Sequence, residues 1–314
     1  MQLIQVVAAV LKDGQGRVLV NQRPAGKPWA GYWEFPGGKI EAGETPRTAL
    51  ERELQEELGV KVREARPWLQ LSHDYPERRV ELDVWRVHGF SGTPHAREGQ
   101  ALARVQPEEL DGWRLLPADA PIVTALRLPP QMLVTPSPDT ERSRFFDALD
   151  KALQRGAEFV QLRAPEIAPP GYAQLAREVI ALCRARGVRA VLNAAPELAR
   201  ELAADGVHLS SARLAGISQR PLPKDFLTGA SCHDEAEIRR AQALGLDYLV
   251  LGPVLRTPSH PQAKVLGWEG FARLAALSPL PVYAIGGMRP EHQKKARALG
   301  GHGIAAIRSL WSAG

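Results

Sequence analysis

The 314-residue chain is 44% hydrophobic and 24% charged, which is typical of a globular protein long enough for two domains. Its formal charge of +5 comes mainly from scattered arginines, and no Lys/Arg block with interleaved aromatic residues predicts stable nucleic-acid binding. The two cysteines, Cys183 and Cys232, exclude a disulfide framework and lack metal-ligand spacing, which suits a reducing cytoplasm.

The N-terminal sequence MQLIQVVAAVLKDGQGRVLV predicts a strand, a turn and a second strand. It lacks the basic segment and long apolar stretch of a signal peptide. Asp13 and Gly14 interrupt its apolar run too early for a membrane span. We therefore expect a cytoplasmic protein that does not contact a membrane.

Residues 1–128 predict a mixed α/β domain. A helix is expected over residues 45–58, followed by two strands within residues 68–90 and a final helix over residues 117–128. The proline-bearing residues 129–132 then predict a short linker between two domains.

Residues 133–314 have a different rhythm, in which eight apolar runs mostly alternate with helical stretches. Continuous apolar runs are typical of parallel strands that are buried on both faces, so the pattern predicts a (β/α)₈ barrel of the TIM type. An open doubly wound sheet is the alternative, but no G-x-G-x-x-G turn follows the first strand. Because only SLWSAG follows the eighth run, the closing helix is expected to be truncated.

Carboxylates crowd the first predicted helix. On that helix, Glu53, Glu56 and Glu57 fall within one narrow arc beside an apolar stripe of leucines. Like charges at this spacing repel one another, so the cluster is costly unless a cation is present. Hard divalent cations prefer oxygen ligands and share them with substrate phosphates, so the cluster predicts a Mg²⁺ site.

The residues around this helix support the same interpretation. Thr45 and Pro46 provide a helix cap and a favourable first position. Gly37 and Gly38 allow the backbone to approach a metal ion or phosphate closely. Arg52, beside the acidic arc, is expected to hold a glutamate in position through a bidentate pair.

Taken together, this segment resembles the Nudix box, G-x₅-E-x₇-R-E-U-x-E-E-x-G-U with U an aliphatic residue. The matching positions are Gly38, Glu44, Arg52, Glu53, Leu54, Glu56, Glu57, Gly59 and Val60. The match is complete at fixed spacing, which makes it far more specific than an isolated glycine loop.

Residues 1–128 are similar to MutT-type Nudix hydrolases, the 8-oxo-dGTP diphosphatases. The resemblance implies an α/β/α sandwich with a mixed sheet and a Mg²⁺ cofactor, with Mn²⁺ as a substitute. It also implies that a nucleoside triphosphate is hydrolysed to a monophosphate and pyrophosphate. Removal of 8-oxo-dGTP in this way would cleanse the nucleotide pool and prevent mutation.

The same resemblance implies the site residues. The implied metal ligands are Gly37, Glu53, Glu56, Glu57 and Glu98. The implied catalytic residues are Glu53 as the base, with Glu98, Arg52 and Glu44. The implied substrate-binding residues are Arg23, Glu34, Phe35, Pro36, Gly37, Gly38, Lys39 and Asp119.

Two positions depart from the MutT pattern. Asp119 stands where the family has an asparagine, and an ionised aspartate accepts hydrogen bonds but cannot donate them. Asp119 would therefore face the O6 atom of an oxidised guanine unfavourably unless it is protonated. Pro28 stands where the family can have a side-chain donor. The reaction class is thus better specified than the base.

Residues 133–314 resemble the thiamine-phosphate synthase and thiazole tautomerase group, through stretches such as VQLRA, ADGVHLSS and DYLVLGPV. The resemblance implies a phosphate site at Gly286 and Gly287. The synthase's lysine and metal-binding carboxylates are missing, with Pro165 and Ala194 at two of those positions. His233 or His260 would be the acid or base of a tautomerase, but we expect a catalytically degenerate barrel.

Two alternatives to the 8-oxo-dGTP diphosphatase remain open. The Nudix site could act on another pyrophosphate linked to thiamine metabolism, or the protein could be a binding protein whose barrel holds a thiazole or phosphate ligand. The sequence leaves the oligomeric state open.

Overall fold

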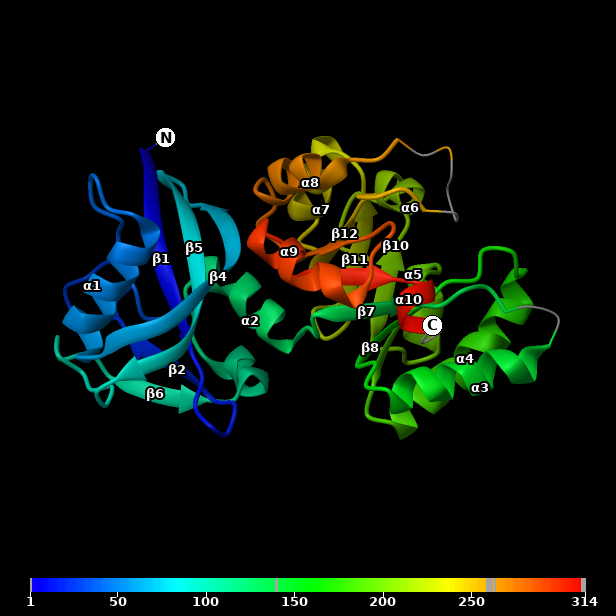
Figure 1. Cartoon of the computed structure of the whole chain (residues 1–314), viewed down its shortest axis with the longest axis horizontal. Helices are drawn as coiled ribbons and strands as arrows, with labels where there is room; N and C mark the ends of the chain where they lie inside the picture. Colours follow the sequence, from blue (N-terminus) through cyan, green and yellow to red (C-terminus); the bar gives the residue numbers. More distant parts are fainter. Residues whose placement is uncertain (1, 139–140, 258–261, 263, 312–314) are drawn as a thin grey trace. The chain divides into compact units, whose positions relative to one another are not determined.

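The structure is a computed structural model that describes residues 2–138, 141–257, 262 and 264–311. The chain divides into two compact units, Met1–Arg127 and Leu128–Gly314 (Figure 1). Within the described ranges, no helix is long and apolar enough to cross a membrane.

The first unit contains two three-stranded sheets, one mixed and one antiparallel. The mixed sheet has the order β1-β5-β4, in which β1 and β5 are parallel and β5 and β4 antiparallel. The antiparallel sheet has the order β3-β2-β6. The elements of this unit are β1 (Gln2–Leu11), β2 (Val18–Gln22), β3 (Trp33–Glu34), α1 (Pro46–Leu58), β4 (Lys61–Asp74), β5 (Arg78–Ser91), β6 (Leu102–Val105), the 3₁₀ helices η1 (Pro107–Gly112) and η2 (Pro117–Asp119), and α2 (Ala120–Arg127).

Strand β1 separates two hydrophobic cores because its side chains alternate between the faces of the sheet. Val7, Ala9 and Leu11 belong to the core that contains the leucine stripe of α1. Ala8 and Val10 belong to the core that contains the apolar residues of α2. The predicted α/β/α sandwich is therefore confirmed.

The predicted first helix is also confirmed. The Thr45 hydroxyl accepts a hydrogen bond from the Thr48 amide at 3.2 Å, and Pro46 occupies the first turn. Gly59, at φ 67°, ends α1 in the left-handed conformation that favours glycine. Leu50, Leu54 and Leu58 are buried. This burial sets which side of α1 its glutamates occupy.

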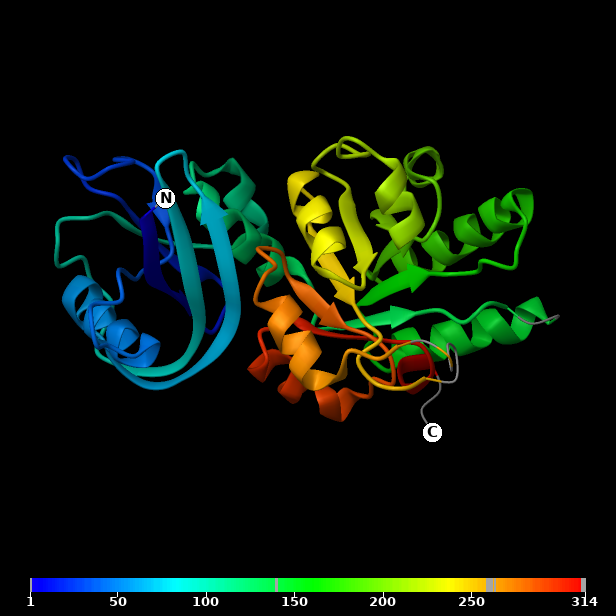
Figure 2. The ribbon, with the colours of Figure 1, turned by 90° about the horizontal axis from the view of Figure 1, so that it is seen from above.

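The second unit is a closed barrel of eight parallel strands, as predicted, with the order β10-β11-β12-β13-β14-β7-β8-β9. Its helices lie outside the ring of strands (Figures 1 and 2). Its strands are β7 (Gln131–Val134), β8 (Phe159–Leu162), β9 (Arg189–Leu192), β10 (Gly206–Leu209), β11 (Leu227–Cys232), β12 (Tyr248–Leu251), β13 (Val282–Ala284) and β14 (Gly303–Ala306). Its helices are α3 (Arg142–Gln154), α4 (Pro169–Ala185), α5 (Pro196–Glu201), α6 (Ser211–Gly216), α7 (Glu235–Ala243), α8 (Gly267–Ala275), η3 (Pro290–His292), α9 (Gln293–Ala298) and α10 (Arg308–Trp311).

Two details at the ends of the barrel concern the sequence predictions. Residues 131 and 132, expected in the linker, are the first two residues of β7. The hydroxyl of Tyr283 donates to the carbonyl of Pro129 at 2.6 Å, so the segment before β7 is also bonded to the barrel. After β14, α10 spans Arg308–Trp311 and reaches the last described residue, so the expected truncation of the closing helix stays a prediction.

The barrel interior is a packed core rather than a pore. The cluster that fills it contains Phe159, Tyr248 and Tyr283, together with smaller residues of other strands. Because side chains alternate along a strand, Gln161 shares its face with Phe159, two residues earlier. Polar residues thus enter the barrel interior toward the carboxyl ends of the strands, where barrel enzymes have their sites.

Gly229 tests this packing, because a Cβ atom there would lie 2.1 Å from the ring of the buried Tyr248. We expect Gly229→Ala to lower the free energy of unfolding of the barrel by about 1–3 kcal/mol, the usual cost of overpacking. Differential scanning calorimetry of the full chain measures the change. Gly216→Ala is the control, since no atom lies within 4 Å of the added carbon. Equal thermal midpoints for the two variants would contradict the packing described here.

Candidate functional site

The guanidinium of Arg52 joins the acidic residues of α1 to the preceding loop. It donates to both carboxylate oxygens of Glu44 at 2.8 and 2.9 Å, and to Glu53 at 2.9 Å. It also donates to Glu56 at 3.2 Å and to the carbonyl of Lys39 at 3.0 Å. One cation therefore holds three glutamates and the loop backbone in fixed positions.

Glu44 serves as the anchor of this arrangement. Hydrogen bonds from Arg52, together with one from the Glu41 amide at 3.0 Å, lower the pKa of Glu44 to about 2. Glu44 is consequently ionised at neutral pH and fixes the guanidinium. Glu53 then receives an Nη1 hydrogen bond from an arginine whose orientation is already set.

The glycine loop lies directly against these carboxylates. A Cβ atom on Gly38 would lie 2.3 Å from the carboxylate of Glu53, and one on Gly37 would lie 2.1 Å from the Val7 carbonyl. Gly37 has φ 148° and donates its amide to Glu57 Oε2 at 3.2 Å. Only glycine allows this close approach of backbone to carboxylate.

Glu57 is the most buried carboxylate of the cluster, with 9% of its surface exposed. Burial raises its pKa to about 8, and repulsion from Glu34, Glu53 and Glu98 adds to the effect. Burial also raises the pKa of Glu53. The carboxylates are therefore close enough to repel one another, and a positive charge near them would stabilise their ionised forms.

Glu98, in the loop before β6, is near enough to raise the pKa of Glu53 and of Glu57. Its carboxylate forms an ion pair with Lys27 at 2.8 Å, and its amide donates to Gln100 Oε1 at 2.8 Å. Gln100 is buried and donates to the Glu57 carbonyl at 2.9 Å, which ties the loop to the end of α1.

The donor set has the chemistry that Mg²⁺ requires. All of its members are oxygen atoms, and the glycine cradle leaves no room for a side chain at Gly38. In the ranges that the structure describes, no three His, Cys, Asp or Glu side chains already converge as a metal cluster. Arg52, Lys27 and the Gly37 amide instead hold the carboxylates.

The residues expected to bind the base form a second group beside the first. Arg23 forms a 2.5 Å ion pair with Glu34 and donates to the Pro28 carbonyl at 2.7 Å. The Phe35 amide donates to Asp119 Oδ2 at 3.1 Å. The Phe35 ring is buried in the hydrophobic core, so its backbone, rather than an open ring face, borders the site.

Asp119 is buried, with 4% of its surface exposed. Burial and repulsion from Glu34 raise its pKa to about 8. At neutral pH the carboxyl group is therefore largely protonated, and it can donate as well as accept a hydrogen bond. Of the two states left open by the sequence, the structure favours the protonated one.

The loop that carries Pro28 connects these two groups through two residues, Lys27 and Trp29, that the sequence analysis did not single out. Its Lys27 pairs with Glu98, and its Trp29 lies 5.6 Å from Tyr75 between ring centroids. Trp29 is 37% exposed and has φ 62°, which is unusual for a residue other than glycine. Tyr75 contacts the backbone of Ala118, next to Asp119. The sequence contained little indication of the position of Trp29, because a loop rich in glycine and proline has no hydrophobic periodicity.

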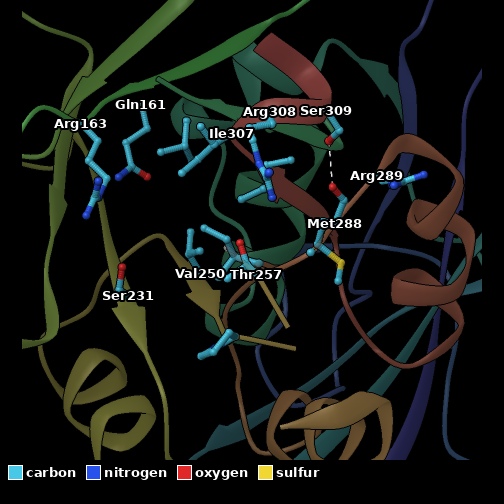
Figure 3. Close-up of a pocket in the computed structure, with 18 of the residues that line it drawn as sticks. Gln161, Arg163, Ser231, Val250, Thr257, Met288, Arg289, Ile307, Arg308 and Ser309 are labelled. Atoms are coloured by element: carbon cyan, nitrogen blue, oxygen red, sulfur yellow. Dashed lines mark hydrogen bonds between the residues drawn. The ribbon is translucent and has the colours of Figure 1, made fainter. Parts of the chain in front are cut away.

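A separate cavity of about 1070 Å³ opens at the carboxyl ends of the barrel strands (Figure 3). The polar and glycine residues that line it include Gln161, Arg163, Asn193, Ser231, His233, Arg256, Gly286, Gly287, Arg308 and Ser309. His233 Nδ1 lies 3.0 Å from Glu237 Oε2. His260 lies outside the described residues.

Gly286 and Gly287, the expected phosphate site, lie on this cavity. Their φ angles are 95° and 66°, and added Cβ atoms would come within 2.9 Å of the neighbouring loop. The Ser309 hydroxyl donates to the Met288 carbonyl at 2.8 Å, shown as a dashed line in Figure 3. The loop after β13 is thereby joined to α10, which follows β14.

Each of the two units is similar to a known protein family. A model of the NUDIX domain matches residues 7–125, and a model described as thiamine monophosphate synthase matches residues 131–310. A CTP pyrophosphohydrolase of Escherichia coli is 42% identical over 125 residues, which cover 40% of this chain and 92% of that protein. An 8-oxo-dGTP diphosphatase of Haemophilus influenzae is 36% identical with the same coverage.

For the second unit, a thiamine-phosphate synthase of Thermus thermophilus is 35% identical over 184 residues, which cover 58% of this chain and 88% of that protein. The two resemblances stated from the sequence are confirmed. The chain therefore belongs to two families, as a Nudix hydrolase that acts on phosphoric anhydride bonds over its first unit and as a member of the thiamine monophosphate synthase family over its second.

Proposed function

We propose that the first unit is a Mg²⁺-dependent nucleoside triphosphate pyrophosphohydrolase, with Mn²⁺ as a substitute. One observation carries the proposal. Helix α1 places Glu53 and Glu57 against the Gly37–Gly38 loop, and a hydrogen bond from Arg52 holds Glu53 in position. The implied products are a nucleoside monophosphate and pyrophosphate. The two curated relatives of this unit, named as a CTP pyrophosphohydrolase and an 8-oxo-dGTP diphosphatase, support the same reaction class.

The residues of this chain divide the work. Glu53, Glu56, Glu57 and Glu98, with the Gly37 backbone, would hold the divalent ion. The bound ion supplies positive charge that neutralises phosphate oxygens and lowers the pKa of water. Arg52 and Glu44 orient Glu53, which accepts the proton of the attacking water as the phosphoric anhydride bond breaks. Lys39 is exposed and adds a point charge for the phosphate tail.

For the base, 8-oxo-dGTP is the substrate we propose first. The N7–H and O6 atoms of 8-oxoguanine form a donor beside an acceptor, and a protonated Asp119 carboxyl can pair with both. Guanine presents two acceptors at the same edge, so it cannot make both bonds. Hydrolysis of 8-oxo-dGTP would remove an oxidised precursor and so prevent mutation.

A cytosine nucleotide is the second candidate, and the neutral state of Asp119 favours it as well. Cytosine presents its N4–H₂ donor beside the N3 acceptor, which the same carboxyl group can pair with. The similarity to a CTP pyrophosphohydrolase at 42% identity supports this candidate. A pyrophosphate linked to thiamine metabolism remains a third possibility, to be included in the same assay.

Glu53→Gln tests the proposed base. We expect kcat for pyrophosphate release from 8-oxo-dGTP or CTP, with Mg²⁺, to fall by about 10²–10⁴-fold because the proton acceptor is lost. Glu51→Gln is the control on the same helix, since Glu51 is exposed and pairs with Arg47. A wild-type protein that releases pyrophosphate from no nucleotide of a panel including dGTP, or an active Glu53→Gln, would refute the proposal.

Trp29→Ala tests whether the nucleobase stacks on the loop beside Tyr75. Loss of stacking costs about 1–3 kcal/mol per base, so we expect KM to rise roughly five- to hundredfold with little change in kcat. Trp29→Phe is expected to restore most of the affinity. An unchanged KM for the alanine variant would show that the base lies elsewhere, without affecting the proposed reaction class.

Asp119→Asn tests the protonated carboxyl. Between the unfolded pKa of 3.8 and the folded pKa of about 8, the native protein binds one proton more than the unfolded chain. The free energy of unfolding therefore falls as pH rises through this range, by at most about 1.4 kcal/mol per pH unit from this group. The asparagine variant lacks this titrating group. Its free energy of unfolding, relative to that of wild type, should therefore increase from pH 4 to pH 8.

Urea unfolding at several pH values measures this slope. Asp111→Asn provides the control, since it makes the same change of side chain at an exposed position. A parallel dependence on pH for wild type and Asp119→Asn would contradict the raised pKa.

A further inference from the structure

The loop before β6 binds the carboxyl end of α1 through several donors. The amide of His95 donates to the Leu58 carbonyl at 3.2 Å. The amide of Arg97 donates to the Glu57 carbonyl at 3.1 Å, and its guanidinium donates to the Gln55 carbonyl at 2.8 Å. The last carbonyls of a helix lack partners inside the helix, and this loop supplies them. The loop is thus attached to α1 on the amino-terminal side of Glu98.

Gln100 makes the attachment on the other side of Glu98. Its Oε1 atom accepts a hydrogen bond from the Glu98 amide at 2.8 Å, and its Nε2 atom donates to the Glu57 carbonyl at 2.9 Å. The side chain is buried, with 5% of its surface exposed. One carboxamide group therefore bridges the backbones of two glutamates that lie far apart in the sequence.

This bridge requires a side chain that both accepts and donates. A carboxamide has an acceptor and a donor on one planar group, whereas an ionised carboxylate only accepts and a thioether is at most a weak acceptor. A buried polar group that loses its partner is penalised, so burial of Gln100 favours the geometry in which both bonds are made. Gly99, at φ 75°, forms the turn that brings the Gln100 side chain back to the Glu98 amide.

The carboxylate of Glu98 depends on this backbone attachment for its position. Glu98 is exposed, so packing around its own side chain does little to fix it. Its ion pair with Lys27 is also solvent-exposed, with 50% of the lysine side chain and 41% of the glutamate side chain accessible. Exposed ion pairs of this kind contribute little. The Glu98 backbone, held by Gln100, therefore decides where the carboxylate can reach.

We propose that Gln100 is a positioning residue that sets the affinity of the Nudix site for divalent ions by holding the Glu98 backbone against the end of α1. The inference rests on the proposed function of the first unit, in which Glu57 and Glu98 help to hold the ion. Gln100 acts through these two glutamates rather than by contact with the ion. Removing a group that orients metal ligands typically costs about 10–100-fold in metal affinity or activity.

Gln100→Met tests the proposal, because methionine keeps the length of the side chain but makes neither hydrogen bond. Titration of the full chain with Mn²⁺, followed by the paramagnetic resonance signal of the free ion, measures the affinity without substrate. We expect the dissociation constant to rise about 10–100-fold. A second variant, Gly99→Ala, strains the same turn without a clash, since no atom lies within 4 Å of the added carbon, and it should also weaken Mn²⁺ binding.

The Mg²⁺ dependence of pyrophosphate release separates positioning from a general loss of structure. In Gln100→Met the Mg²⁺ concentration that gives half of the maximal rate should rise by a factor similar to that for Mn²⁺. Saturating Mg²⁺ should restore most of kcat, because the ligands themselves are intact. A partly unfolded variant would instead lose rate at every Mg²⁺ concentration with an unchanged midpoint.

A double-variant cycle shows whether Gln100 acts through Glu98. Glu98→Gln removes the carboxylate that Gln100 positions. In that background Gln100→Met should weaken Mn²⁺ binding by no more than about threefold, because coupled residues are not additive.

Gln106→Met is the matched control, since its Nε2 atom donates to the Gln15 carbonyl at 3.2 Å and so joins two other segments. It should bind Mn²⁺ as wild type does, and thermal unfolding verifies that each variant is folded. Wild-type affinity in Gln100→Met and Gly99→Ala, or an equal loss with and without the Glu98 carboxylate, would overturn the inference but leave the proposed function intact. A wild-type chain that binds no Mn²⁺ would overturn both.

Discussion

The hydrogen-bonded guanidinium of Arg52 is the interaction on which the first unit depends. Glutamates three and four residues apart on a helix repel one another, and Glu53 and Glu57 are further penalised by burial. Arg52 offsets part of this cost by bonding Glu44, Glu53 and Glu56 at once. The remaining cost falls on Glu57, which has the Gly37 amide as its donor. A site that stays strained in this way is suited to a cation.

Burial and like charge act on the Asp119 carboxyl group as they act on the glutamates of α1. Burial penalises the charge of Asp119, and Glu34 is near enough to add repulsion. Arg23 bonds to Glu34 and to the Pro28 carbonyl, and its charge lowers the pKa of Asp119 by less than burial and Glu34 raise it. The pKa of the carboxyl group is therefore raised, so that the group is largely protonated at neutral pH. It thereby acquires a hydrogen-bond donor, as the asparagine of the MutT pattern has.

The barrel retains the architecture of its family but has different chemistry at the site. The aromatic rings of Phe159, Tyr248 and Tyr283 pack together in the barrel interior. Ala194 stands where the metal-binding aspartate of the synthase is expected, and four arginines are among the described residues that line the cavity. A barrel tolerates such exchange because its site is built from loops and strand ends, whereas its stability comes from the layers below. The catalytic degeneracy of the barrel, expected from these sequence positions, stays a prediction.

The sequence by itself determined the two folds and the position of the acidic cluster. The cap at Thr45, the leucine stripe and the nine-position box are local patterns, and so are the eight apolar runs of the barrel. Only the tertiary structure decided the raised pKa of Asp119, the contact of Lys27 with Glu98, the exposure of Trp29 and the presence of four arginines around the barrel cavity. These features join residues far apart in the chain, and pKa values depend on burial and on neighbouring charges. Neither burial nor a distant neighbour is written in a local pattern.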